Sequence, residues 1–140
     1  LISREEGKMK ALTLTQPWAT LVILGEKHYE TRSWSTRYRG PLVIHASKTF
    51  PKWARELSLS PPFLGALTRV VHPLPLGAII GCVTVLDCLP TEHVRAALSS
   101  QELAFGDFSP GRWAWILGDP VPYDNPIHAR GALAVWDWQP

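Results

Sequence analysis

The chain has 140 residues, a formal net charge of +2, 46% hydrophobic residues, two cysteines and seven tryptophans. This length and composition predict one globular domain that buries about two-thirds of its unfolded surface. No apolar run approaches the roughly 20 residues of a membrane-spanning helix, and the opening residues lack the apolar core of a signal peptide. We therefore predict a single domain over residues 9–140, a leader or upstream extension over residues 1–8, and no membrane partner.

The first predicted elements are a short strand over residues 10–15 and a helix over residues 16–24. Thr15 is expected to cap this helix, and Pro17 is tolerated in its first turn, where backbone N–H groups lack intrahelical partners. Gly25 suits the left-handed position that ends a helix. The chain should therefore reverse direction at this glycine.

The next predicted strand, residues 28–34, carries charges at alternate positions. Because alternate side chains of a strand share a face, Glu30 and Arg32 should lie side by side, with Lys27 at the edge of the same unit. Charges on a half-buried strand are costly unless they pair or meet a ligand. Two interpretations stay open at this point: a structural ion pair beneath the helix, and a ligand-binding site.

The rest of the chain predicts further short elements separated by proline-rich connections. The predicted strands span residues 41–47, 77–89, 112–117 and 131–138, and the predicted helices span residues 49–57, 63–70 and 91–98, the last of them capped by Thr91. A bend is expected at Gly81, and residues 121–126 are expected to form a proline-rich turn. Five or six short strands with interposed helices predict an α+β fold or a small β-barrel.

The two cysteines, Cys82 and Cys88, fall within one predicted strand. Six residues of straight strand separate Cα atoms by roughly 20 Å, far beyond the about 7 Å that a disulfide tolerates. We therefore expect reduced thiols, which suit a cytoplasmic protein.

Positive charge is concentrated between residues 26 and 55, where seven Lys or Arg residues stand against two Glu residues. This segment sums to +5 and the remainder of the chain to −3. Within this segment, residues 32–39 alternate cations with aromatic side chains. Single-stranded nucleic acid is bound by this combination, because cations meet phosphates and aromatic rings stack on bases. Cation–π packing within the protein is the alternative. The candidate binding residues of this segment are Lys27, Arg32, Trp34, Arg37, Tyr38, Arg39 and Lys48.

Two blocks of sequence carry a family resemblance. Residues 25–32, GEKHYETR, match the pattern G-x-K-x-x-E-x-R, and residues 106–117, GDFSPGRWAWIL, form the second block. Together with the upstream stretch LTLTQPWATL, they resemble the ASCH (activating-signal-cointegrator homology) domains over residues 10–138. The resemblance implies a PUA-like fold, a small β-barrel with helices at one side, and binding of RNA or another nucleic acid.

The same resemblance places a binding cleft beside the first block. Because the two blocks have little reason to occur together unless they meet in space, we expect Asp107, Ser109 and Arg112 to join Lys27, Glu30 and Arg32 there. Glu30 should then accept a charge-assisted hydrogen bond from Arg32 or Lys27.

An enzymatic alternative also follows from the resemblance. Some small bacterial ASCH proteins are amidohydrolases that act on N4-acetylcytidine, and others are ribonucleases. The hydrolases use a Lys, a Thr three residues later, and a Glu from a helix after the long central strand. Lys27 corresponds to the first, Glu102 or the competing Glu92 to the last, but Glu30 stands where the Thr would be. This departure favours binding over catalysis, and a modified nucleoside remains the alternative ligand.

No recognisable metal, cofactor or nucleotide-binding motif is present. The five histidines lack ligand spacing, and two cysteines do not make a structural zinc site by themselves. The sequence also lacks a Walker loop and a nucleophile elbow. We therefore expect neither a metal nor a cofactor.

Overall fold

Six strands form one mixed sheet in the order β2-β5-β4-β3-β1-β6. This computed structural model describes residues 7–140, so the leader predicted at residues 1–8 lies almost wholly outside the described residues. The strands are β1 Met9–Leu14, β2 Tyr29–Arg32, β3 Gly40–Ala46, β4 Ala78–Pro90, β5 Trp113–His128 and β6 Val135–Trp138. The helices are α1 Trp18–Ile23, α2 Lys52–Ser58, α3 Phe63–Ala66, α4 Thr91–Val94 and α5 Ser100–Ala104, with a 3-10 turn at Arg95–Ala97.

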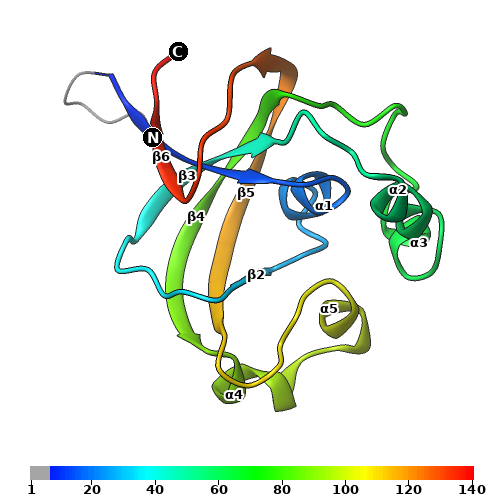
Figure 1. The fold of residues 1–140 in the computed structure, drawn as a ribbon, viewed down its shortest axis with the longest axis vertical. Coiled ribbons are helices and arrows are strands. Elements are labelled where there is room, and N and C mark those ends of the chain that lie inside the picture. The colour runs from blue at the N-terminus through cyan, green and yellow to red at the C-terminus, as the bar shows by residue number, and fades with distance from the viewer. Residues whose placement is uncertain (1–6) are drawn as a thin grey trace.

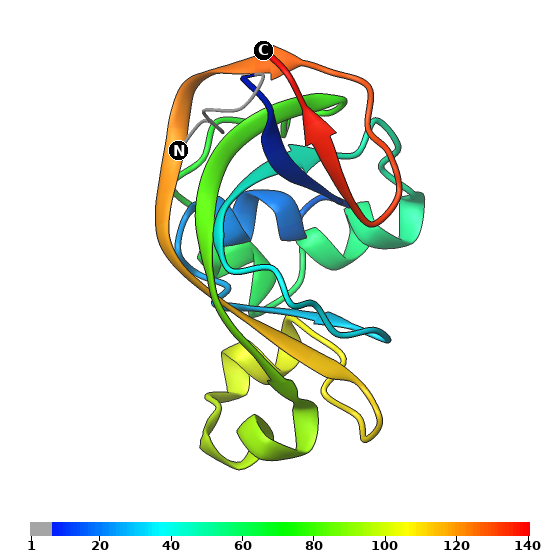
Figure 2. The same ribbon diagram turned by 90° about the vertical axis from the view of Figure 1, so that its left-hand side faces the viewer.

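The predicted α+β class is confirmed, but the sheet does not close into a barrel. β2 and β6 are edge strands of four residues each, and each pairs on one side only, with β5 and β1 respectively. The long strands β4 and β5 bend strongly, so the sheet curves around α1 (Figures 1 and 2). The main core lies in this curve, where Val22 and Ile23 of α1 pack with Leu42, Val83 and Trp115 of the sheet.

Helix α1 ends as predicted, although it does not begin as predicted. Gly25 has φ +77°, Glu26 N–H donates to Leu21 O at 3.0 Å, and Gly25 N–H donates to Val22 O at 3.1 Å. This is the Schellman pattern, in which a glycine with positive φ closes the last turn. The predicted Thr15 cap is wrong, because the side chain of Gln16 accepts from Thr20 N–H instead, at 3.0 Å. The reversal brings residue 27 directly to the start of β2.

Strand β4 contains the predicted irregularity. The register with β5 shifts between Ile79 and Gly81, and a Cβ at Gly81 would come within 2.5 Å of Val121 O and 2.8 Å of Ile23 Cδ1. A glycine is therefore required for the backbones of the two bent strands to approach under α1. Cys82 also lies on β4, and it and Cys88 are both free thiols.

The turn predicted at residues 121–126 is wrong, because these residues belong to β5. In this half β5 pairs with β4 on one side, for example Gly81 with Pro122, whereas β2 covers only Trp113–Ile116 on the other. Proline is tolerated on such an edge because its missing N–H would have faced solvent. The prolines therefore mark an edge and not a chain reversal.

The loop between β4 and β5 contains a helix that the sequence pattern did not predict. α5 begins after Ser99, whose hydroxyl accepts from Glu102 N–H at 3.1 Å and caps the helix. The predicted cap at Thr91 is wrong, because its hydroxyl donates to Ser109 O at 2.8 Å and ties α4 to the second family block. No helix among residues 7–140 is long and apolar enough to cross a membrane.

Candidate nucleic-acid interface

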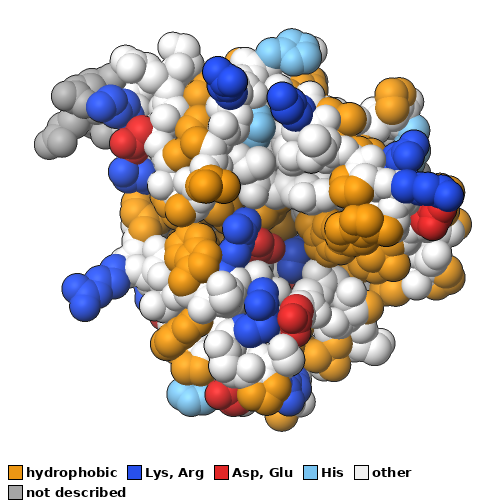
Figure 3. Space-filling model, viewed as in Figure 1, with side chains coloured by type: hydrophobic (Ala, Val, Ile, Leu, Met, Phe, Trp, Pro, Cys, Tyr) orange, Lys and Arg blue, Asp and Glu red, His pale blue; other side chains and the backbone are white. Residues whose placement is uncertain are grey.

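A cavity of about 620 Å³ opens between the two family blocks and the end of β1. Its walls come from β1, the start of α1, β2, α2 and the loop after α5. Figure 3 shows Lys and Arg side chains around a hollow near the centre of this face, with acidic and hydrophobic side chains beside them. The sequence-predicted residues that line the cavity are Lys27, Glu30, Arg32, Asp107 and Arg112.

Lys27 lies at the inner end of the cavity. Its side chain is 1% exposed, its ammonium donates to Tyr29 O, and Nζ lies 3.8 Å from Glu30 Oε1. Burial lowers the pKa of Lys27, and Arg32 acts in the same direction, whereas Glu30 and then Glu102 raise it. In the folded protein desolvation is the largest influence on the pKa of Lys27.

Glu30 and Arg32 form the ion pair expected from their shared strand face. Arg32 Nε donates to Glu30 Oε2 at 2.8 Å, and its Nη2 donates to Thr13 O on β1 at 3.3 Å. The guanidinium thus spans from β2 to β1 at the cavity wall, and its Cζ lies 5.9 Å from the Trp34 ring centroid. The arrangement holds one cation in a fixed position with part of its surface toward the cavity.

The second family block contributes a smaller charged pair. Arg112 Nε lies 3.5 Å from Asp107 Oδ2 and donates to Asp107 O at 3.1 Å. The Ser109 hydroxyl donates to Asp107 Oδ1 at 2.6 Å, and this hydrogen bond is the main reason that the pKa of Asp107 is lowered. Thr31 Oγ1 accepts from Asp107 N–H at 3.1 Å and joins the block to β2.

Two tryptophans for which no binding role was predicted form one wall. Trp18 begins α1 and Trp53 lies on α2; both line the cavity, with ring centroids 5.8 Å apart and a 46° tilt. Trp53 is 60% exposed, which is unusual for so large an apolar side chain. The segment KWAR, residues 52–55, places cations around a ring as residues 32–39 do, and that pattern was the signal available in the sequence.

Several predicted binding residues lie outside this cavity. Trp34 is half-buried and packs edge-to-face on Trp115, with centroids 4.9 Å apart. Tyr38 donates its hydroxyl to Pro41 O, and Arg39 pairs with Asp87 at 3.2 Å. Arg37 and Lys48 are exposed and do not line the cavity, and Ser109 contacts it only through Asp107.

Glu102 is buried on α5 and faces His28 and not the cavity. One carboxylate oxygen lies 2.9 Å from His28 Nδ1, and both oxygens accept from His28 N–H at 3.0 and 3.2 Å. The side chain therefore anchors the start of β2, immediately after Lys27. Its helix does follow the long strand β4, as the resemblance to the hydrolases implies.

The described residues offer no evident place for a metal ion. No group of three or more His, Cys, Asp or Glu side chains in residues 7–140 is arranged to hold one.

Comparison with known proteins identifies the family of the chain. The sequence profile of the ASCH domain matches residues 12–134. The chain belongs to the ASCH domain family. Activating signal cointegrator 1 from Mus musculus is 38% identical over 130 residues, and the match covers 89% of this chain and 21% of that protein. The protein of the same name from Homo sapiens is 40% identical over 87 residues, covering 60% of this chain and 15% of that protein.

Solved ASCH structures share the fold. The ASCH protein from Zymomonas mobilis superposes with a TM-score of 0.52 at 17% identity, covering 85% of this chain and 72% of that one. A point mutant of it gives a TM-score of 0.51 at 15% identity. The α+β fold of this chain is thus shared with a solved ASCH protein. The chain spans only 15–21% of the length of the two curated relatives.

Proposed function

We propose that this ASCH domain binds single-stranded nucleic acid, and RNA in particular, with one base in the 620 Å³ cavity. The observation that carries the proposal is the exposed Trp53 ring, which lines the same cavity as Arg32 and Arg112. A ring for stacking beside cations for phosphates is the usual combination in proteins that bind single strands. Family membership supports a nucleic-acid-related role.

The cavity suits one nucleotide of a longer strand. Its volume lies within the about 300–1,000 Å³ of small-ligand sites. The hollow in Figure 3 opens to solvent, so a strand could leave it on either side. In this arrangement the base stacks on Trp53 beside Trp18, and the carboxylate of Glu30 is available to accept from a base N–H group.

The charged pairs position the cations. Glu30 holds the Arg32 guanidinium and Asp107 holds that of Arg112, so both cations are ordered before a ligand arrives. Pre-ordering lowers the entropy cost of binding. The exposed Arg37 and Lys48 extend the proposed interface beyond the cavity.

The second candidate function is hydrolysis of an N4-acetylcytidine-type nucleoside or of RNA in the same cavity. Buried Lys27 favours it, because a lysine with a lowered pKa is suited to acid–base work. Two features speak against it: Glu30 replaces the hydroxyl that the hydrolases use, and Glu102 is engaged by His28. Binding is therefore the proposal that the geometry favours.

One experiment separates the two candidates. Wild type and Lys27→Met are titrated with a labelled single-stranded RNA hexanucleotide by fluorescence anisotropy, and each is incubated with N4-acetylcytidine and with the RNA. We expect wild type to bind RNA, with affinity falling as salt rises, and to release neither acetate nor shorter RNA. Acetate release or RNA cleavage that disappears in folded Lys27→Met would establish the enzyme, and failure of wild type to bind would exclude the binding role.

A further inference from the structure

A second cavity, of about 410 Å³, lies beside the first. Thr13, near the end of β1, lines both cavities and so forms part of the boundary between them. The other walls of the second cavity come from the residues just after β3, including Lys48, and from the segment between β5 and β6, residues 129–133. The two cavities are thus adjacent on one molecule.

The second cavity differs from the first in charge. Lys48 and Arg130 are exposed at its walls, and no acidic side chain lines it. The first cavity is lined by Lys27, Arg32 and Arg112 together with two carboxylates. Among residues 7–140, neither Lys48 nor Arg130 has an ion pair or a side-chain hydrogen bond. Their charges are not neutralised by a neighbour, which favours an anionic ligand.

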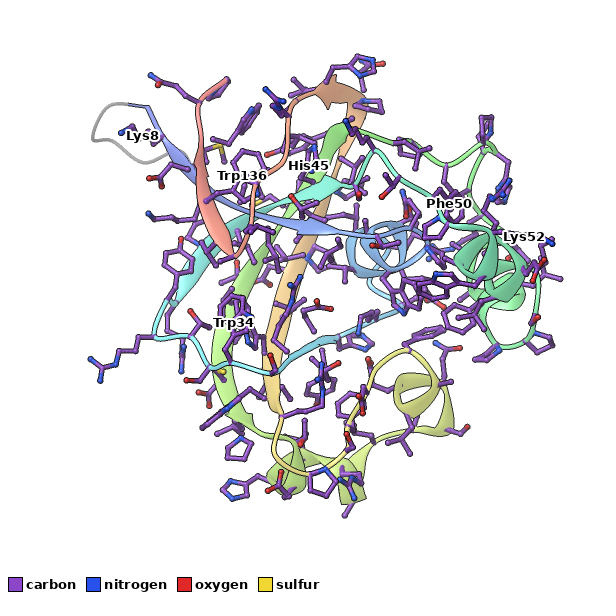
Figure 4. The ribbon with its side chains drawn as sticks, in the orientation of Figure 1. Lys8, Trp34, His45, Phe50, Lys52 and Trp136 are labelled. Carbon is purple, nitrogen blue, oxygen red and sulfur yellow. The ribbon has the colours of Figure 1, made fainter. Side chains whose placement is uncertain are left out.

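A chain of hydrogen bonds holds the shared wall in place. Trp136 Nε1 donates to Thr13 Oγ1 at 3.1 Å, Thr13 Oγ1 lies 3.1 Å from His45 Nδ1, and His45 Nε2 lies 2.7 Å from Ala129 O. Figure 4 shows His45 and Trp136 close together between β1, β3 and β6. A donor on Nε2 leaves Nδ1 as an acceptor for the Thr13 hydroxyl, so each of these groups has a partner. The polar groups of Thr13, His45 and Trp136 are thus paired within the protein, and this wall is held in place without a ligand.

We propose that the second cavity is the subsite for the neighbouring nucleotide of the strand whose base occupies the first cavity. Lys48 and Arg130 contact its phosphodiester, while the apolar side of the cavity, which includes Leu133 at 93% exposure, packs against its sugar or base. This inference rests on the proposed function. It specifies the ligand further, as a single strand of two or more nucleotides that passes Thr13.

The test compares ligands of different length. A nucleoside monophosphate and a single-stranded RNA hexanucleotide are titrated into wild type, Lys48→Ala/Arg130→Ala and a control, Lys10→Ala/Arg69→Ala, at several salt concentrations. The control also removes two exposed positive charges, at positions that line neither cavity. In the Lys48→Ala/Arg130→Ala variant, the log–log salt slope for the hexanucleotide should fall by about 0.7, because the two cations meet a single phosphodiester. Its affinity for the monophosphate should equal that of wild type.

Each other outcome overturns the inference. A hexanucleotide slope equal to that of the control variant means that Lys48 and Arg130 do not meet phosphates, although wild type still binds and the proposed function stands. Loss of monophosphate affinity in the double variant means that these cations serve the first cavity. Failure of wild type to bind the hexanucleotide overturns the proposed function and this inference together.

Discussion

The turn at residues 33–39 and the cavity beside Lys27 differ in how their charged and aromatic residues are distributed along the sequence. The turn is one continuous stretch with an evident basic and aromatic pattern, and the cavity is assembled from five separate elements. In the fold, three of the turn's candidate residues are occupied: Trp34 packs on Trp115, the Tyr38 hydroxyl bonds Pro41 O, and Arg39 pairs with Asp87. Among the described residues, Arg37 is the member with no such contact.

In the cavity, by contrast, the aromatic side chains come from separate elements and one of them stays exposed. Its aromatic wall comes from Trp18 and Trp53, which lie in segments that the pattern assigned to amphipathic helices. Trp53 keeps an exposed ring although it lies next to Trp18. The comparison teaches that charged and aromatic side chains grouped in the sequence can be engaged in contacts within the protein, and are then not available to a ligand. Groups that remain open to a ligand are identified by what they fail to contact.

The largest effect that tests this comparison is expected from Trp53→Ala. A stacked base contributes about 1–3 kcal/mol, so RNA affinity should fall about 5- to 150-fold. Because Trp53 is largely exposed, the melting temperature should change little. Fluorescence anisotropy with a labelled hexanucleotide and thermal denaturation measure the two quantities.

Trp34→Ala is the matched control for that experiment. It removes the edge-to-face contact with Trp115, a geometry that contributes about 0.5–1.5 kcal/mol beyond area burial. Its main effect should therefore be a lower melting temperature, with a smaller loss of affinity than for Trp53→Ala. If Trp34→Ala instead lowers affinity more at unchanged stability, the turn carries the stacking and the comparison is reversed.

A smaller effect is expected within the turn itself. Arg37→Ala should lower the log–log salt slope of RNA binding by about 0.7, which is roughly 2.6-fold in affinity over a fourfold change in salt. Arg39→Ala should leave the slope unchanged, because Arg39 is paired with Asp87 and donates to Thr36 O and Tyr38 O. Equal slopes for both variants and wild type would place the turn outside the interface.

The smallest expected signal is a pH trend in stability that depends on Lys27. Burial lowers its pKa in the folded state from 10.5, so between the folded and unfolded pKa values the unfolded state holds more protons. Stability attributable to Lys27 should then rise with pH toward about 10.5. The melting temperature of wild type relative to Lys27→Met should increase from pH 7 to pH 10. A flat or falling difference would mean that the Glu30 and Glu102 charges outweigh desolvation.

Much of the candidate site was predictable because it depends on short-range regularities. The spacing of Lys27, Glu30 and Arg32 around a glycine reversal and a two-residue strand period leads to one charged unit, and the ion pair is present. The second family block indicated Asp107 and Arg112, which line the same cavity. Trp53 and Thr13 were not predictable in this way, because their place in the cavity depends on how α2 and β1 pack against β2.

The sequence by itself determined the family, the α+β class, the end of α1 at Gly25 and the bend at Gly81, because each follows from local backbone preference or a contiguous motif. Only the tertiary structure decided that the sheet stays open and that residues 121–126 continue β5, because both depend on which strand edges find a partner. It also decided which cations remain unpaired. Asp87 lies 48 residues from Arg39 in sequence yet forms an ion pair with it. In contrast, no acidic side chain lines the cavity beside Lys48.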